Sequence, residues 1–401
     1  MAERLTVEVA IVGGGPAGLV AAIAHAEAGV ETALLARRPA ADHRTTALLA
    51  GSVTALQTLR VWDGCAAHAA PLRVMRIIDA TSRLIRAPEV SFAAAEIGLD
   101  AFGHNIENSH LLAALEARAR ELPALSWIDD EARTVETDKT GGTVTVKSGA
   151  AVRARLVIGA DGCRSLCRTA AGIEVDSRSY PQTALTFNLQ HARQHQDIST
   201  EFHTESGPFT LVPLPGDRSS LVCVLNSTDA ARVGALEGAA LNHEIEQRSH
   251  SILGKVTVEP GRGVFALSIA TARNFAQARV ALVGEAAHLV PPIGAQGLNL
   301  GLRDAATIGE LVVAARRNGG DVGSDELLAR YDELRRSDVR SRSFAVDLLN
   351  RTLLSEFLPM QGARGLGLYA IDRFGPLRRA VMREGTAPSI SQPRLMRGEA
   401  L

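Results

Sequence analysis

Three glycine-bearing stretches, far apart in one chain, decide the fold: Gly13-Gly14-Gly15-Pro16-Ala17-Gly18, Asp161-Gly162-Cys163-Arg164-Ser165 and Gly284-Glu285-Ala286-Ala287-His288. Each follows a short, mostly apolar run of the kind that a buried parallel strand shows, at residues 7–12, 154–160 and 280–283. The first stretch continues into a helix-like segment of small and apolar residues that ends at Gly29. A strand, a glycine turn and a helix in this order predict a Rossmann-type dinucleotide site near the N-terminus.

The glycine pattern of the first stretch gives each small residue a physical role. Gly13 permits a tight turn, Gly15 lets the backbone approach a pyrophosphate, and Gly18 lets the helix pack closely on the strand. The helix N-terminus would also offer unpaired N–H groups and a partial positive charge to the phosphates. The first expected cofactor contacts are therefore Gly13, Gly15, Ala17 and Gly18.

The composition sets limits on the class of protein. The 401 residues include 43 basic and 44 acidic ones, which is enough chain for two or three domains. Balanced charge and only 4% aromatic residues argue against nucleic-acid binding. The four cysteines form no CxxC pair, so we expect no metal site and a reducing compartment. With neither a signal peptide nor an uncharged run of ~18 residues, the expected location is the cytoplasm.

The three motifs, in this order, resemble those of the FAD-dependent aromatic hydroxylases, which are single-component flavoprotein monooxygenases. The chain is most similar to the ubiquinone-biosynthesis hydroxylases, which oxidise a polyprenylated phenol. The stretches that carry this similarity are Ala50-Gly51-Ser52-Val53, Ile106-Glu107-Asn108 and the run from Gly284 to Asp304.

The resemblance implies an α/β fold. A Rossmann-like FAD-binding domain with a parallel sheet would be interleaved with a mainly antiparallel β-sheet substrate domain, and a C-terminal helical segment would follow. The implied boundaries are 1–72, 101–178 and 271–330 for the discontinuous FAD-binding domain, 73–100 and 179–270 for the substrate sheet, and 331–401 for the helical region.

The resemblance also implies further FAD contacts, at Arg44, Asp161, Gly162, Gly284, Glu285, Gly297, Leu298 and Asn299. Arg44 would meet the pyrophosphate and ribityl region, and the Asp161-Gly162 motif is also implicated in NADPH use. Pro292 and Gly294 would lie near the flavin ring, and the backbone after them would face its C2 carbonyl. A helix N-terminus there would stabilise the negative charge of reduced flavin.

Several alternatives stay open for these residues. Arg44 is alternatively an exposed loop arginine, and Asp161 an ordinary cap on a helix. His288 is expected to pack or hydrogen-bond rather than act as a base. No catalytic side chain is singled out, since the flavin carries the chemistry.

Two positions depart from the family pattern: Glu285 keeps the carboxylate that most relatives supply as Asp, whereas Ala36 replaces an acidic residue altogether. About 20 residues after the glycines, an acidic residue is expected to hold the adenosine ribose. This chain has Ala36 there, followed by Arg37 and Arg38. FAD would then be bound more weakly or by other groups, or its adenosine half would be held differently.

The implied reaction uses NAD(P)H to reduce FAD transiently and O2 to form a C4a-hydroperoxyflavin, which hydroxylates an aromatic ring. The substrate implied is a lipid-like polyprenylated phenol. One alternative is a small soluble aromatic substrate, and another is a non-catalytic flavoprotein scaffold of a quinone-synthesising complex. Other quinone-biosynthesis proteins are then candidate partners.

The C-terminal residues 361–401 hold more arginines than acids, mixed with apolar residues. Such a segment would suit peripheral contact with anionic lipid at the inner face of the membrane. A helix that closes the core and leaves its arginines in solvent is the alternative.

Overall fold

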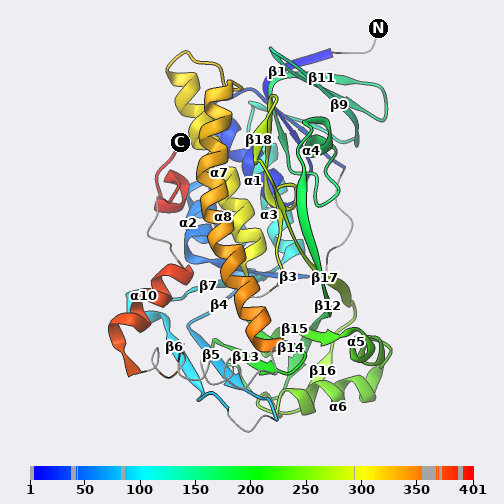
Figure 1. Ribbon diagram of the computed structural model, residues 1–401, viewed down its shortest axis with the longest axis vertical. Coiled ribbons are helices and arrows are strands. Elements are labelled where there is room, and N and C mark those ends of the chain that lie inside the picture. The colour runs from blue at the N-terminus through cyan, green and yellow to red at the C-terminus, as the bar shows by residue number, and fades with distance from the viewer. Residues whose placement is uncertain are drawn as a thin grey trace.

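A computed structural model describes residues 4–37, 42, 44–82, 86–292, 294–354, 367, 369, 373–386 and 392–401. Arg38, which was considered with Ala36, and parts of the predicted helical region 331–401 lie outside the described residues. The described chain forms a mixed sheet, a largely antiparallel sheet and a smaller sheet between them, with long helices running along the molecule (Figure 1).

The first sheet contains the parallel strands that the sequence predicts. Its order is β18 (Ala276–Gln277), β19 (Val280–Leu282), β11 (Ala151–Gly159), β1 (Arg4–Val12), β2 (Thr32–Leu35) and β8 (Leu125–Ile128), with β9 (Ala132–Asp138) and β10 (Gly141–Val146) joined at β11. Strands β19, β11, β1, β2 and β8 pair in parallel. Val9, Ala10 and Ile11 are fully buried, as expected for a central strand covered on both faces.

The second sheet has the order β20 (His288–Leu289), β17 (Gly263–Ala272), β12 (Val175–His191), β15 (Arg218–Asn226), β14 (Gly207–Leu214), β13 (Ile198–Thr204), β5 (Val74–Asp79) and β6 (Val90–Ala93), with β16 (Val256–Val258) beside β12. Its pairs are antiparallel except β13 with β5. Helices α5 (Ser227–Gly234) and α6 (Gly238–Arg248) pack on its outer face. The predicted fold class is confirmed, while the exact domain boundaries stay a prediction.

A small sheet joins the two larger ones. It comprises β3 (Thr45–Leu49), β7 (Gly103–Glu107) and β4 (Ala69–Pro71). Asn105 in β7 donates to the carbonyl of Pro213 at 2.9 Å and to the Ser220 hydroxyl at 3.0 Å. These hydrogen bonds attach the small sheet to the second sheet.

The remaining elements are mostly helical. They are α1 (Pro16–Glu27), α2 (Ala50–Thr58), α3 (Asn108–Arg120), α4 (Leu166–Ala170), α7 (Gln296–Arg317), α8 (Asp325–Leu354) and α10 (Gly375–Thr386), with 3-10 turns η1 (Trp62–Gly64), η2 (Ala66–His68), η3 (Ala94–Ile97), η4 (Gly284–Ala286) and η5 (Arg394–Arg397). Helix α8 begins at Asp325, six residues before the predicted 331, and it contacts strands of both large sheets (Figure 1). None of the helices in the described ranges is long and apolar enough to cross a membrane.

A buried histidine lies where α1 packs against α7. His25 is fully buried, its Nδ1 lies 2.7 Å from the carbonyl of Ala21, and its Nε2 has no partner among the described residues. Burial lowers the pKa of His25 from 6.5 to about 4.

The pKa of His25 predicts an acid-sensitive contribution to stability. The folded pKa of His25 lies below the unfolded one. The contribution of His25 to the free energy of unfolding is therefore constant above pH 6.5 and falls by about 3 kcal/mol between pH 6.5 and 4. His25→Gln should flatten this part of the pH profile of the unfolding free energy, measured by urea denaturation. The half-exposed His110→Gln should leave it unchanged, and an equal effect of both variants would contradict the assignment.

Candidate active site

The first two glycine segments pack against each other at the end of β1. Gly13 has a φ of +116°, and a Cβ there would overlap the carbonyl oxygen of Ala160, next to Asp161. A Cβ at Gly18 would overlap the carbonyl of Gly13 and lie 3.1 Å from the Cβ of Ala160. Glycine is therefore required at both positions, and the turn before α1 lies directly on the end of β11.

The third segment follows β19, the parallel neighbour of β11, and reaches the same place at the same end of the sheet. Gly284 has a φ of +65°, and a Cβ there would lie 3.3 Å from the Cβ of Ala17. A Cβ at Gly301 in α7 would lie 3.3 Å from Ala17 and 3.1 Å from the Cα of Gly284. Small residues thus bring the starts of α1, η4 and α7 into contact, and the three segments form one site.

Two helices present their N-termini here without a side-chain cap from any described residue. The N-cap of α1 is Gly15, and that of α7 is Ala295, which has a φ of +54°. The first N–H groups of a helix have no partner within it and carry partial positive charge. No described atom outside its neighbours lies within 4 Å of a Cβ built on Gly15, so this backbone faces open space. The arrangement is suited to a phosphate or another anion.

The predicted ring-side residues form the entry to α7. Pro292 and Gly294 are exposed, and Ile293 between them lies outside the described residues. Gly297 is exposed, and Leu298 is half-buried in the first turn of the helix. The backbone of these residues is therefore accessible where the helix begins.

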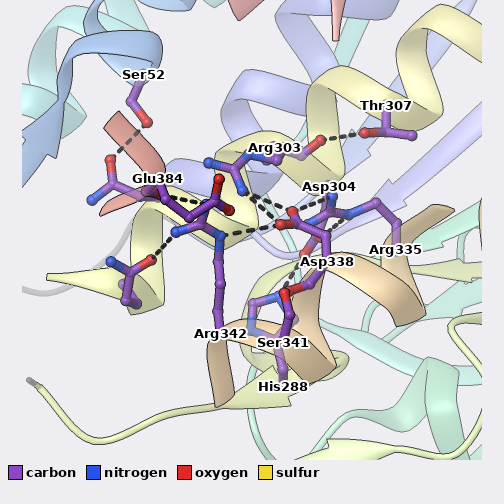
Figure 2. Close-up of polar contacts among 12 residues, drawn as sticks. Ser52, His288, Arg303, Asp304, Thr307, Arg335, Asp338, Ser341, Arg342 and Glu384 are labelled. Carbon is purple, nitrogen blue, oxygen red and sulfur yellow. Dashed lines mark hydrogen bonds and ion pairs between the residues drawn. The ribbon is translucent and has the colours of Figure 1, made fainter. Parts of the chain in front are cut away.

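Asn299 fixes the start of α7 through contacts that the sequence did not reveal. Its buried Oδ1 accepts from the backbone N–H of Leu49 at 2.9 Å and from the Ser52 hydroxyl at 2.7 Å. Its Nδ2 donates to the carbonyl of Ala47 at 2.8 Å. The side chain thus ties α7 to β3 and α2, and this explains physically why a serine lies in the stretch at residues 50–53 (Figure 2 labels Ser52).

Arg44 and Glu285 lie in the same region, on the side of the second sheet. The Arg44 guanidinium donates to Asp42 through Nε at 2.9 Å and Nη2 at 2.8 Å, and lies 5.7 Å from the centre of the Phe265 ring. The hydrogen bond to Asp42 raises the pKa of Arg44, and the charge of exposed Glu285 adds to this. Burial alone would raise the pKa of Asp42, but hydrogen bonds from Arg44 and Asn108 outweigh it and lower that pKa to about 2.

The Asp161 side chain is engaged in capping α4. Its Oδ1 accepts from the Ser165 hydroxyl at 2.5 Å, and its Oδ2 accepts from the N–H groups of Leu166 at 2.7 Å and Cys167 at 3.1 Å. Arg168 donates to the carbonyls of Ala286 and Cys163, each at 2.8 Å, so it joins this loop to η4. The capping role left open by the sequence is what the carboxylate performs, and Gly162 has a φ of +78° in the turn.

Ala36 is buried beneath the first glycine turn. A Cβ on Gly14 would lie 2.8 Å from the Cβ of Ala36, so the two small residues pack tightly. The carbonyl of Ala36 accepts from Trp127 Nε1 at 3.0 Å, and the exposed Arg37 lies 3.7 Å from Glu131. An acidic group is therefore near this strand end, but it comes from the segment after β8.

Behind the site lies a buried ionic network centred on Asp304, which is 0% exposed (Figure 2). Its Oδ2 accepts from the backbone N–H of Gly284 at 2.9 Å and lies 2.7 Å from His288 Nε2. Its Oδ1 accepts from Arg335 Nε at 2.6 Å. Burial would raise the pKa of Asp304, but His288 and Arg335 outweigh it and lower that pKa. One carboxylate thus joins η4, β20, α7 and α8.

The network continues along one face of α8 through Asp338. This carboxylate accepts from Arg303 at 2.8 Å, Arg335 at 2.7 Å and Arg342 at 3.1 Å. Arg342 also donates to Gln296, the first residue of α7, at 3.2 Å. Burial lowers the pKa of Arg303 more than Asp338 raises it. The spacing 335, 338, 342 is a helical-face signal that sequence inspection could have found.

Removing the charge of Asp304 from this network should strongly destabilise the folded protein. Asp304→Asn should lower the free energy of unfolding by about 3 kcal/mol, because it leaves the buried charge of Arg335 poorly compensated. The matched control Glu121→Gln, which breaks an exposed pair with Arg118, should cost less than about 1 kcal/mol. Urea denaturation followed by circular dichroism measures both, and similar losses would contradict a structural role for Asp304.

The comparisons with known proteins agree with this geometry. The family described as "FAD binding domain" matches residues 6–342. The ubiquinone hydroxylase UbiL of Rhodospirillum rubrum is 37% identical over 98% of this chain and 93% of its own length. The 3-demethoxyubiquinol 3-hydroxylase of Escherichia coli is 31% identical over 94% of this chain and 97% of its own.

Among solved structures, the p-nitrophenol 4-monooxygenase PnpA from Pseudomonas putida DLL-E4 has the same fold. The two superpose with a TM-score of 0.78 at 20% identity, covering 95% of this chain and 98% of that one. At 20% identity, this structural similarity supports the fold alone. The family match and the two relatives carry the assignment: the chain belongs to the FAD-binding-domain family and is an FAD-dependent aromatic hydroxylase, a monooxygenase that uses O2.

Proposed function

We propose that this enzyme hydroxylates a polyprenylated phenol intermediate of ubiquinone biosynthesis, with NAD(P)H as transient reductant. The observation that carries the proposal is the convergence of the three glycine segments on one site, in a chain that matches two ubiquinone-type hydroxylases over nearly its full length. FAD, when bound, supplies the activation of O2 and the transfer of one oxygen atom. The protein has to bind, orient and shield the reacting groups.

The proposed FAD contacts are Gly13, Gly15, Ala17, Gly18, Arg44, Asp161, Gly162, Gly284, Glu285, Gly297, Leu298 and Asn299. The open space above Gly15 and the free N–H groups of α1 suit a pyrophosphate. Arg44 would turn from Asp42 toward it. Asp161 would act through its turn and backbone, since its carboxylate caps α4. Ala36, at the adenosine end, does not fit the expected pattern, because its methyl side chain offers the ribose no acceptor.

The N-terminus of α7 would stabilise negative charge on the flavin ring. Its uncapped N–H groups at Gly297 and Leu298 provide a fixed partial positive charge, which costs no reorganisation when negative charge develops on the ring. Pro292 and Gly294 precede this turn and would border the ring. Asn299 holds the helix start in place through its bonds to β3 and α2.

The face of the second sheet opposite α5 and α6 is suited to an apolar ring. Successive side chains of a strand point to opposite faces, and Leu185 and Leu225 face the helices. Their neighbours Ala184 and Val224 form an apolar cluster on the other face with Tyr180 and Leu267. This cluster is the proposed wall for a prenylated phenol. Arg178, whose guanidinium carbon lies 5.1 Å from the centre of the Tyr180 ring, is beside it, so a soluble aromatic acid stays the alternative substrate.

Helix α10 is the proposed membrane contact. Met382 buries one side of it against β6 and η3, and Arg378 pairs with Glu96 at 2.6 Å. Leu377 and Val381, one turn apart, are exposed together with Phe374. An apolar stripe flanked by arginines suits the anionic inner face of a membrane, where other quinone-biosynthesis proteins would also be met. The bulk of the protein would then lie in the cytoplasm.

Two glycine variants separate binding of FAD from folding. Gly15→Ala introduces a methyl group into open space, so the apoprotein should unfold at an unchanged urea concentration while FAD affinity falls at least about tenfold. Gly18→Ala overlaps the Gly13 carbonyl and should lower both. Fluorescence titration with FAD provides the binding measurement. Unchanged affinity in Gly15→Ala would contradict the proposed pyrophosphate contact.

The substrate class is tested by the quinone-lipid profile of cells that lack this protein, measured by mass spectrometry. We expect a prenylated phenol lacking one oxygen to accumulate, and its structure identifies the ring carbon that is normally hydroxylated. Complementation with the wild-type chain should clear it. An unchanged profile would contradict the ubiquinone role and favour a soluble aromatic substrate or a scaffold.

A further inference from the structure

A concave site lies on the outer face of the second sheet, opposite the face that we propose receives the aromatic ring. It is a cavity of about 650 Å³ whose walls include Arg76, Arg193, His195, Thr200, Leu211 and Leu253. Leu211 and Leu253 belong to the core beneath α5 and α6, which is on the face opposite the Tyr180 cluster. We propose that this cavity binds a small phosphate-type anion.

Two arginines in the cavity carry charge that no described carboxylate neutralises. Arg76 donates through Nε at 3.2 Å and Nη2 at 3.0 Å to the buried hydroxyl of Thr200, a neutral partner. Arg193 makes one long bond of 3.4 Å, to the carbonyl of Ser251. Their neighbour Arg73, by contrast, pairs with Asp197 at 3.2 Å. Unpaired cations in a concave site focus positive potential toward an anion.

His195 shapes the cavity but adds no charge. Its Nε2 lies 3.0 Å from the carbonyl of Leu214 and 3.1 Å from that of Gly216, so this nitrogen must be the donor. Its Nδ1 accepts from the backbone N–H of Asp197 at 3.0 Å. Both nitrogens are thereby satisfied in the neutral ring, and the anion would be met by the two guanidinium groups.

The loops on either side of the cavity are held in unfavourable backbone conformations. Gln196 and Asp197 have φ values of 54° and 58°, and His250 and Ser251 have values of 50° and 52°. Residues with side chains rarely adopt this left-handed region, and strain of this kind gathers at ligand sites. Both turns are closed by backbone bonds, from Ile198 to His195 at 3.0 Å and from Ile252 to Ser249 at 3.2 Å.

Phosphate is the ligand chemistry that fits these features together. Guanidinium groups match the oxygens of a phosphate with paired, charge-assisted hydrogen bonds. The volume lies within the range of small-molecule sites, so a phosphorylated metabolite or a phospholipid headgroup would fit. Both ligands present a phosphate group to the two arginines, and binding to lipid vesicles distinguishes the two.

The test is calorimetric titration of the FAD-loaded protein with inorganic pyrophosphate at constant ionic strength. Wild type should bind one equivalent, and Arg76→Gln with Arg193→Gln should bind roughly a hundredfold more weakly. Arg133→Gln, which removes an exposed charge from β9, is the matched control and should bind like wild type. If the double variant unfolds, the exposed Arg193→Gln alone should still weaken binding about tenfold.

Vesicles of phosphatidylglycerol in phosphatidylcholine identify the source. Because α10 is unchanged in the double variant, weaker sedimentation of the double variant than of wild type would support a lipid headgroup. Pyrophosphate binding with equal sedimentation of both proteins would support a soluble phosphate compound. No pyrophosphate binding, or equal binding by wild type and the double variant, would overturn the proposal.

Discussion

The buried carboxylate of Asp304 is the constraint on which the rest of the site depends. It holds the backbone N–H of Gly284 at 2.9 Å and Arg335 Nε at 2.6 Å, so α7, η4 and α8 meet at one charged group. A buried charge is costly unless it is paired and fully hydrogen-bonded. That cost favours a single relative position of the three elements, and this position sets where the α7 N-terminus points.

The same network couples the far end of the chain to the start of α7, where we propose that the flavin ring is held. Arg342 in α8 contacts Asp338 at 3.1 Å and Gln296 at 3.2 Å, and its Nη2 donates to the carbonyl of Glu384 at 3.3 Å in α10. The proposed membrane helix is therefore linked by hydrogen bonds to the first residue of α7. Docking of α10 on a surface and the geometry at the ring would share one set of contacts.

Sequence patterns predicted the parts that depend on local backbone requirements. The turns at Gly13 and Gly284 have positive φ, and the strands before them are mostly apolar, so both could be predicted from short windows. The contact between Arg335 and Asp304 could not be predicted from the sequence, because a sequence shows that two helix faces carry charged residues but not that these faces meet. Asp42, two residues before Arg44, was overlooked as its partner, and the cavity at Arg76 depends on contacts between distant segments.

This chain is expected to hold FAD although Ala36 replaces the usual acid. The visible spectrum of the purified protein tests this expectation most directly. We predict about one FAD per chain and oxidised-flavin bands at roughly 370 and 450 nm, which NAD(P)H bleaches and O2 restores. A colourless protein that takes up no added FAD would contradict the account and would favour a scaffold without redox chemistry.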